Sequence, residues 1–199
     1  MGRRYDLIDD SLNRWLSDQP LYFVATAPSG DAGHLNLSPK GGAGTFRVLS
    51  PTTVAYLDLV GSGIETVSHL RENGRIVLMF CAFAGPPKIV CLHGQGRVVT
   101  RDDPEFAALL EGFACAADLM DLARSVVVVE ASRIADSCGF VVPQMTYQRD
   151  RDQLVRWGQH RSELVGEGWR EEYEAEKNVV SIDGLPGLRL AAVPAAGND

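Results

Sequence analysis

The sequence lacks the short motifs by which common enzyme classes are recognised. It has no Gly-x-Ser-x-Gly elbow, no Walker A lysine loop and no His-Glu-x-x-His pair. Hydrolases, nucleotide kinases and zinc proteases of those types therefore find no support here. Two Gly-x-Gly fragments, at 61–63 and 94–96, are too short for a dinucleotide-binding fingerprint, and the second lies within a predicted strand. The absent motifs leave other kinds of ligand site to be considered.

The chain also lacks basic clusters, long apolar runs and closely spaced cysteines. A formal net charge of -7 and a pI near 5.1 argue against a nucleic-acid partner, because phosphate contacts need grouped lysines and arginines. No run approaches the ~20 apolar residues of a membrane span, and the N-terminal segment has no apolar signal region. We therefore expect a cytoplasmic protein with no membrane partner. The four scattered cysteines favour reduced thiols over structural disulfides.

What is present is a series of short β-rich runs in a chain of 199 residues, which is long enough for one sizeable core. Aromatic and β-branched residues gather in runs separated by glycine, proline and serine, a pattern typical of strands joined by tight turns. The predicted strands are 21–28, 33–39, 45–50, 53–59, 75–83, 88–100 and 124–136, and the predicted helices are 9–19, 62–73 and 102–122. Many short strands with few helices predict a mainly β fold with peripheral helices, a closed or partly closed barrel.

The C-terminal part of the chain has a different composition. Residues 150–177 are rich in charge, and their apolar residues recur at helical spacing. We expect two helices there, broken near Val165–Gly168. Residues 1–148 would form a barrel domain with its N-terminal helix, and residues 149–199 a helical extension packed on it. Trp157 and Trp169 either pack this extension on the barrel or anchor a subunit interface, and the sequence leaves both open.

Polar residues around the start of the helix at 62–73 suggest a site for an anionic cofactor. The backbone amides of a first helical turn lack intrahelical partners and can bind a phosphate. Ser62 and Thr66 would add hydroxyl donors, and Lys40, at the end of a neighbouring strand, would add a positive charge. Ser62 is equally suited to cap the helix, and Lys40 to be a solvated turn residue. A phosphate site and an ordinary helix start therefore both remain open.

Four segments of the sequence follow one another in an order that is typical of a known protein family. They are "HLNLSPKGG" (34–42), "TVAYLDLVGSGIETVSHL" (53–70), "RIVLMF" (75–80) and "PPKIVCLHGQGRVV" (86–99). This order resembles the pyridoxamine 5'-phosphate oxidase-like family of FMN-binding split barrels, over roughly residues 15–140. The resemblance implies a split β-barrel that binds FMN. It also implies a homodimer with the flavin cleft at the subunit interface, and an oxidoreductase that exchanges a hydride or electrons with a small organic substrate.

The resemblance also implies which residues form the site. The flavin would be lined by Asn36, Ser38, Pro39 and Lys40 and flanked by Tyr56 and Asp58, and its phosphate would be held by Ser62, Gly63 and Thr66. The segment "SPKGG" would then be a backbone ledge along which the flavin lies. One departure is the turn Gly61-Ser62-Gly63, where many members have an arginine, so phosphate binding would depend more on Lys40 and backbone amides. The C-terminus does not show the arginine and histidine pattern of true pyridoxamine phosphate oxidases, and we do not expect that reaction.

Other ligands remain possible alternatives. Related barrels use a deazaflavin cofactor, and a flavin-binding or flavin-sensing protein without turnover would need the same residues. A haem would require an axial histidine, for which His34, His69 and His160 are candidates. A zinc ion would draw on Cys91 and His93, which share one strand face, and on Cys81, with a fourth ligand unidentified. We expect no metal site, and we name no catalytic acid or base, because a flavin would supply the redox chemistry.

Overall fold

The computed structural model describes residues 2–188, and one eight-stranded antiparallel sheet dominates it. The strands are hydrogen-bonded in the order β3-β2-β6-β7-β8-β5-β4, with β1 beside β8. They are β1 (Arg4–Tyr5), β2 (Leu21–Thr26), β3 (Asn36–Gly41), β4 (Phe46–Val48), β5 (Thr53–Leu59), β6 (Arg75–Cys81), β7 (Ile89–Thr100) and β8 (Ala123–Ser137). The helices are α1 (Asp10–Ser17), α2 (Glu65–Glu72), α3 (Phe106–Leu110), α4 (Ala117–Met120), α5 (Gln153–Val165) and α6 (Trp169–Lys177).

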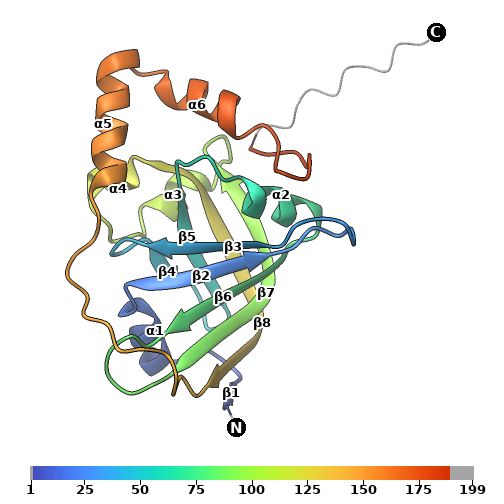
Figure 1. Ribbon diagram of the computed structural model, residues 1–199, viewed down its shortest axis with the longest axis vertical. Helices are drawn as coiled ribbons and strands as arrows, with labels where there is room; N and C mark the ends of the chain where they lie inside the picture. The colour runs from blue at the N-terminus through green and yellow to red at the C-terminus, as the bar shows by residue number, and fades with distance from the viewer. Residues whose placement is uncertain (1, 189–199) are drawn as a thin grey trace.

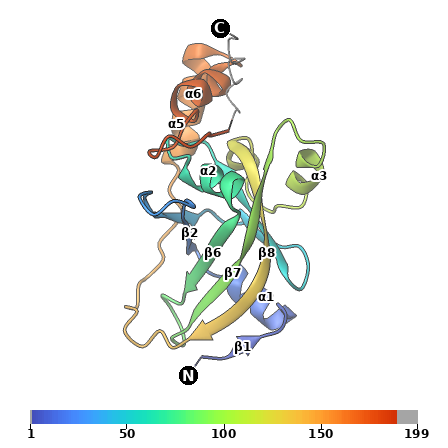
Figure 2. The ribbon, with the colours of Figure 1, turned by 90° about the vertical axis from the view of Figure 1, so that its right-hand side faces the viewer.

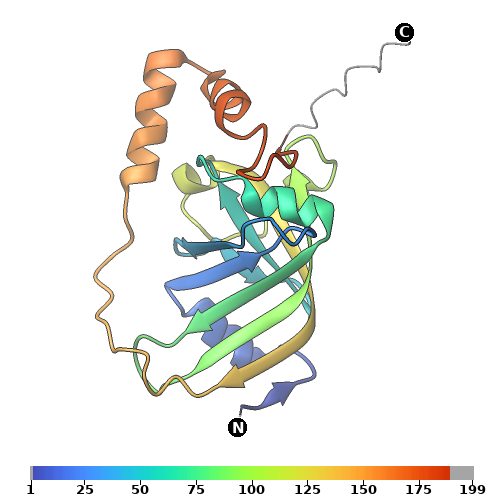
Figure 3. The ribbon, with the colours of Figure 1, turned by 45° about the vertical axis from the view of Figure 1, so that its right-hand side comes forward.

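The sheet curls around α1, which lies at one end of its concave side (Figure 3). Asp9 caps this helix by accepting a hydrogen bond from the Leu12 amide at 2.8 Å. Leu12 and Leu16 face inward and are buried against the same core cluster as Val24 and Leu78 of the sheet. The prediction of a mainly β split barrel with peripheral helices is confirmed by this half-closed sheet.

The valine run of β8 separates two layers of core. Neighbouring side chains of a strand point to opposite faces, so Val127 and Val129 join the barrel core while Val126 and Val128 join a second cluster. The second cluster also takes in apolar side chains of α3, which covers the outer face of the sheet (Figure 2). Because both of its faces are covered, β8 is apolar without interruption from Val126 to Val129.

One predicted helix is wrong in extent. We expected a single helix over 102–122, but the structure has the short helices α3 and α4 with a break between them. The break falls at Gly112 and Phe113, where the Arg47 guanidinium occupies the space that a side chain at Gly112 would need. Phe113 is buried in the cluster beneath β8. Packing of this phenylalanine and arginine therefore overrides the helical periodicity of the run.

The C-terminal helices pack on one end of the barrel (Figure 1). As expected, α5 and α6 are separated at Gly166, which has a φ of 89°. Trp169 is buried with Val60 and Leu122, and Trp157 lies 5.4 Å from it between ring centroids. The division at residue 148 stays a prediction, and residues 189–199 of the expected extension lie outside the described residues. Within the part of the chain that the structure describes, no helix is long and apolar enough to span a bilayer.

Candidate functional site

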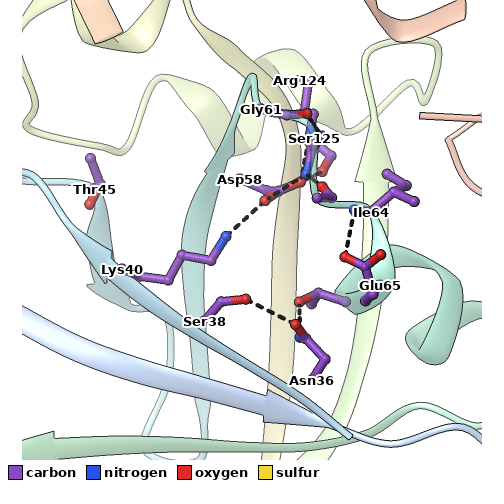
Figure 4. A network of polar contacts seen from close by, with 12 residues as sticks. Asn36, Ser38, Lys40, Thr45, Asp58, Gly61, Ile64, Glu65, Arg124 and Ser125 are labelled. Carbon is purple, nitrogen blue, oxygen red and sulfur yellow. Dashed lines mark hydrogen bonds and ion pairs between the residues drawn. The ribbon is translucent and has the colours of Figure 1, made fainter. Parts of the chain in front are cut away.

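Three polar side chains of β3 point to the same side of this edge strand. Because side chains alternate along a strand, Asn36, Ser38 and Lys40 turn together toward β5 and α2, while Leu37 and Pro39 are exposed on the other face. Ser38 Oγ donates a hydrogen bond to Asn36 Oδ1 at 3.1 Å (Figure 4). An ammonium, an amide and a hydroxyl group thus share one space beside the sheet.

Asp58 of β5 lies at the centre of a buried ionic group. Its side chain is 1% exposed, and Lys40 Nζ lies 3.1 Å from its Oδ1. Arg124 Nε lies 2.7 Å from its Oδ2, to which Ser125 Oγ also donates at 3.1 Å. A buried charge is tolerated only when it is paired and hydrogen-bonded, and both oxygens of this carboxylate have partners.

Opposing effects act on the pKa of Asp58. Burial raises this pKa because it disfavours the charged form, but the positive charges of Arg124 and Lys40 outweigh burial and hold the pKa well below its usual range. Burial likewise lowers the pKa of Arg124, and Asp58 more than restores it. The group therefore stays ionised, and two positive charges around one negative charge leave it with one positive charge.

A β-bulge on β8 directs Arg124 to Asp58. Asp58 is paired with Ser125, but the next pair joins Leu59 to Ala123, so Arg124 is an extra residue on β8. In a regular strand, Arg124 and Ser125 would point to opposite faces. The bulge changes this local geometry, and both side chains reach the same carboxylate.

Arg124 also holds the turn that precedes α2. It donates to the carbonyl oxygens of Gly61 at 2.7 Å and Gly63 at 2.6 Å, and to Asn178 Oδ1 at 3.0 Å. Asn178 Nδ2 donates to the Gly61 carbonyl at 2.9 Å. The residues expected from the sequence included neither Arg124 nor Asn178. An arginine at the head of a valine-rich strand was a usable signal, because a buried charge needs a partner, whereas no local pattern marks Asn178.

Among the described residues no side chain caps the first turn of α2, but the carboxylate of Glu65, the first residue of the helix, binds the amide just before it. The N-cap position is Ile64, whose backbone N–H donates to Glu65 Oε2 at 3.0 Å. Ser62 is exposed and is not the helix cap that its position in the sequence allowed. The carboxylate of Glu65 therefore occupies part of the helix end at which a phosphate was expected.

Asn36 connects β3 to α2 through a short chain of polar groups. Its Nδ2 donates to Thr66 Oγ1 at 2.9 Å and to Thr26 Oγ1 at 3.2 Å. Thr26 Oγ1 in turn lies 2.9 Å from Nδ1 of His69, a fully buried residue of α2. Burial lowers the pKa of His69 despite carboxylates nearby, which favours the neutral ring. These hydrogen bonds fix the orientation of Asn36 relative to α2.

The structure brings together six of the nine residues that the sequence predicts for the site. One cavity of about 150 Å³ is lined by Asn36, Ser38, Lys40, Asp58, Gly63 and Thr66, together with Arg124 and Glu65. The remaining three lie elsewhere: Tyr56 is in the barrel core, Pro39 is on the outer face of β3, and Ser62 is exposed. Contact of these nine residues with a flavin stays a prediction.

A larger cavity, of about 1560 Å³, begins where β3 ends. Its walls come from the end of α1, the turn at Gly41–Gly44, the loop between β6 and β7, and residues 145–150. None of the predicted site residues lines it. Pockets for drug-sized ligands measure about 300–1000 Å³. By this measure the larger cavity has space for a tricyclic ring, and the smaller one does not.

The residues proposed for zinc lie on the neighbouring strands β6 and β7, and those proposed for haem lie on separate segments of the chain. Across residues 2–188, no group of three or more His, Cys, Asp or Glu side chains is placed to hold a metal ion. Cys81 is buried and Cys91 half-buried, while His93 is exposed. His34 is ion-paired with a carboxylate of the segment after α6, and His160 is exposed on α5. The three zinc candidates therefore do not form such a group within the described residues.

The curled antiparallel sheet, with a polar cavity between its edge strand and α2, defines a split-barrel protein. No family model matches the sequence. The pyridoxamine 5'-phosphate oxidase family protein ustO of Aspergillus flavus is 38% identical over 197 residues, covering 94% of this chain and 78% of the relative. The chain therefore belongs to the pyridoxamine 5'-phosphate oxidase family, as the order of its sequence segments predicted.

Solved structures give more distant likenesses. An FMN-binding protein from Syntrophomonas wolfei has a TM-score of 0.46 and 10% identity, with 70% of this chain and 92% of that chain covered. An FAD-binding protein from Mycobacterium smegmatis has a TM-score of 0.43 and 16% identity, with 67% and 97% covered.

Proposed function

We propose that this protein is a cytoplasmic flavoprotein that binds FMN and acts as an oxidoreductase on a small organic substrate. The observation that carries the proposal is the polar cavity, where Lys40 and Arg124 flank Asp58 and this ionic group keeps one positive charge, beside neutral donors of β3 and α2 and the carboxylate of Glu65. A cation with neutral hydrogen-bond donors suits a phosphate and the hydroxyl groups of a ribityl chain. Membership of the pyridoxamine 5'-phosphate oxidase family, whose split barrels bind FMN, supports the same assignment.

The small size of the polar cavity means that it would hold only one end of the cofactor. With about 150 Å³, it can take a phosphate and adjoining hydroxyl groups but no tricyclic ring. The ring would lie outside it, beside the edge of β3, whose opposite face bears the exposed side chains of Leu35 (83%) and Leu37 (65%). We propose that a second copy of the chain covers this surface and the ring, in a homodimer.

The residues of the chain would bind and orient the cofactor. A bound flavin would supply the electron-accepting ring. Lys40 would pair with the anionic end, and Asn36 and Ser38 would offer hydrogen bonds along β3. Arg124 would keep the turn at 61–63 in place through its two carbonyl contacts. No described side chain is assigned a role as acid or base.

The cofactor can be identified directly. We expect the purified protein, or the protein reconstituted with FMN, to show a flavin absorbance spectrum, and mass spectrometry of the released molecule to give FMN. Release of FAD or of a deazaflavin would correct the identity of the cofactor. A protein that retains no flavin after reconstitution would contradict the proposal.

Turnover is a separate question that stopped-flow absorbance can answer. We expect NADH or NADPH to reduce the bound flavin and oxygen or an organic acceptor to reoxidise it, with the first step faster than for free FMN. A bound flavin that reacts no faster than free FMN would contradict the oxidoreductase assignment. Flavin binding or sensing without turnover would then be the function.

A further inference from the structure

Glu65 is the first residue of α2, and its carboxylate lines the polar cavity at the start of this helix. Its Oε2 accepts a hydrogen bond from the Ile64 amide at 3.0 Å, and its Oε1 accepts one from the Ile182 amide at 3.4 Å. It lines the cavity together with Lys40 and Arg124 (Figure 4). The carboxylate thus lies between the helix end and the segment that follows α6.

The charges that line the cavity cancel when Glu65 is included. Lys40 and Arg124 contribute two positive charges, and Asp58 and Glu65 contribute two negative charges. The two carboxylates differ in their partners. Asp58 is buried and ion-paired with both cations, whereas Glu65 is half-buried and has no ion pair within the described part of the chain. Glu65 alone therefore offsets the net positive charge of the Asp58 group.

We propose that Glu65 weakens the preference of the site for a ligand that ends in a phosphate over one that ends in a hydroxyl group. This inference rests on the proposed flavin site. The Glu65 carboxylate occupies the Ile64 amide at the start of α2, which would otherwise be open to a phosphate, and it repels the phosphate through its charge. A neutral ligand such as riboflavin meets no such repulsion. Glu65 is thus a residue that sets specificity for the charge of the ligand.

The variant Glu65→Gln tests this role. Glutamine keeps a side-chain oxygen that can accept from the Ile64 amide, and it removes the charge. Quenching of flavin fluorescence gives the affinities of the apoprotein for FMN and riboflavin. We expect FMN to bind about ten-fold more tightly to the variant, with riboflavin changed by less than about two-fold. Glu65→Ala should raise the ratio of FMN to riboflavin affinity in the same direction.

Glu72→Gln is the matched control, because it makes the same charge change at the other end of α2. The Glu72 carboxylate accepts a hydrogen bond from the Ser29 amide at 2.7 Å and does not line the cavity. We expect its FMN to riboflavin ratio to equal that of the wild type. Thermal unfolding of each variant confirms that the fold is retained.

The possible outcomes separate the two proposals. An unchanged FMN to riboflavin ratio in Glu65→Gln overturns the role of Glu65 and leaves the flavin site standing. An equal rise in Glu72→Gln also overturns it, because the effect would then follow net charge alone. If the wild type and the variants bind neither flavin, the flavin site itself is wrong and the inference fails with it.

Discussion

Asp58 draws together cations from two distant strands, Lys40 of β3 and Arg124 of β8. A buried ion pair adds little stability over well-packed apolar residues of similar volume, but removal of one partner leaves a buried charge unpaired and is strongly unfavourable. The group is therefore poorly explained as a stabilising device alone. Its contacts instead hold Lys40 and the turn before α2 in place beside the polar cavity.

Asp58→Asn should destabilise the fold by about 3–5 kcal/mol, because Lys40 and Arg124 would lose their buried counter-charge. Unfolding in urea, followed by tryptophan fluorescence, measures the change. Glu130→Gln is the control, since the exposed Glu130 carboxylate accepts hydrogen bonds from two threonines, and its loss should cost less than about 1 kcal/mol. Equal losses in the two variants would show that the ionic group contributes nothing particular.

The stabilities of the wild type and of Asp58→Asn should also depend differently on pH. The cations lower the pKa of Asp58 in the folded protein, so its stabilising contribution is complete above the unfolded pKa of about 3.9 and is lost as the pH falls further. The wild type should lose more stability below pH ~4 than Asp58→Asn does. Unfolding free energies measured from pH 7 downward give the comparison, and parallel curves would refute the assignment.

Lys40→Ala should weaken FMN binding ten- to a hundred-fold, the equivalent of a charge-assisted hydrogen bond of about 1.5–3 kcal/mol. Riboflavin should be affected less, because it carries no phosphate. Lys40→Arg should recover only part of the loss, since a planar guanidinium fits a one-point site poorly. Titration of the apoprotein measures each affinity, with the exposed Lys177→Ala as control. Equal FMN affinity in the wild type and Lys40→Ala would remove Lys40 from the site.

Among the connecting elements, the turn between β3 and β4 depends on its glycines. Gly42 and Gly44 have φ values of 98° and 76°. A Cβ atom at Gly44 would lie 2.4 Å from the carbonyl carbon of Ala114, between α3 and α4. Gly44 therefore has a packing role, and Gly42, the last residue of the segment SPKGG, has a left-handed backbone.

Gly44→Ala should destabilise the protein by more than about 2 kcal/mol, because the left-handed backbone costs roughly 1–2 kcal/mol and the loop at Ala114 must also move. Gly85→Ala is the matched control. Its φ is 71°, and no atom lies within 4 Å of the added Cβ, so only the backbone cost of about 1–2 kcal/mol applies. Urea unfolding compares them, and equal losses would mean that the Ala114 contact is unimportant.

The elements that the sequence predicted well are those with a strong local pattern. Asn36, Ser38 and Lys40 were expected from the family resemblance together with Pro39, which the period of two of the strand places on the other face. Arg124 was missed because its direction depends on a bulge, which arises from pairing with β5. Asn178 was missed because its contact with Gly61 spans 117 positions of the chain. Local patterns therefore predicted the strands, and the family resemblance predicted six residues of the polar cavity, whereas Arg124 and Asn178 depend on tertiary pairing.

For the molecule as a whole, the C-terminal segment is part of the site and not only a cover for the barrel. Beyond Asn178, the Arg71 guanidinium of α2 donates to the Leu188 carbonyl at 2.7 Å. Ser181, in the same segment, is buried near α2, and Ser68 Oγ donates to the Leu185 carbonyl at 3.4 Å. The end of the described chain thus packs along α2 and holds the turn that borders the polar cavity.

The exposed side of β3 bears on the state of assembly. An edge strand leaves backbone hydrogen-bonding groups open to another chain, and β3 is the edge strand at one end of the sheet order. Leu35 and Leu37 are exposed on this strand and just before it. Exposed apolar side chains on an unpaired edge strand are typical of an interface.

We predict a homodimer in which this surface covers the flavin. Light scattering should give a mass of about twice the 21.6 kDa of one chain. Leu37→Lys should shift the protein toward the monomer and weaken flavin binding together, because an unpaired charge would be buried at the interface. Leu164→Lys places the same charge on an exposed leucine of α5 and should change neither property. A wild-type monomer that holds its flavin, or a Leu37→Lys dimer with unchanged affinity, would contradict the prediction.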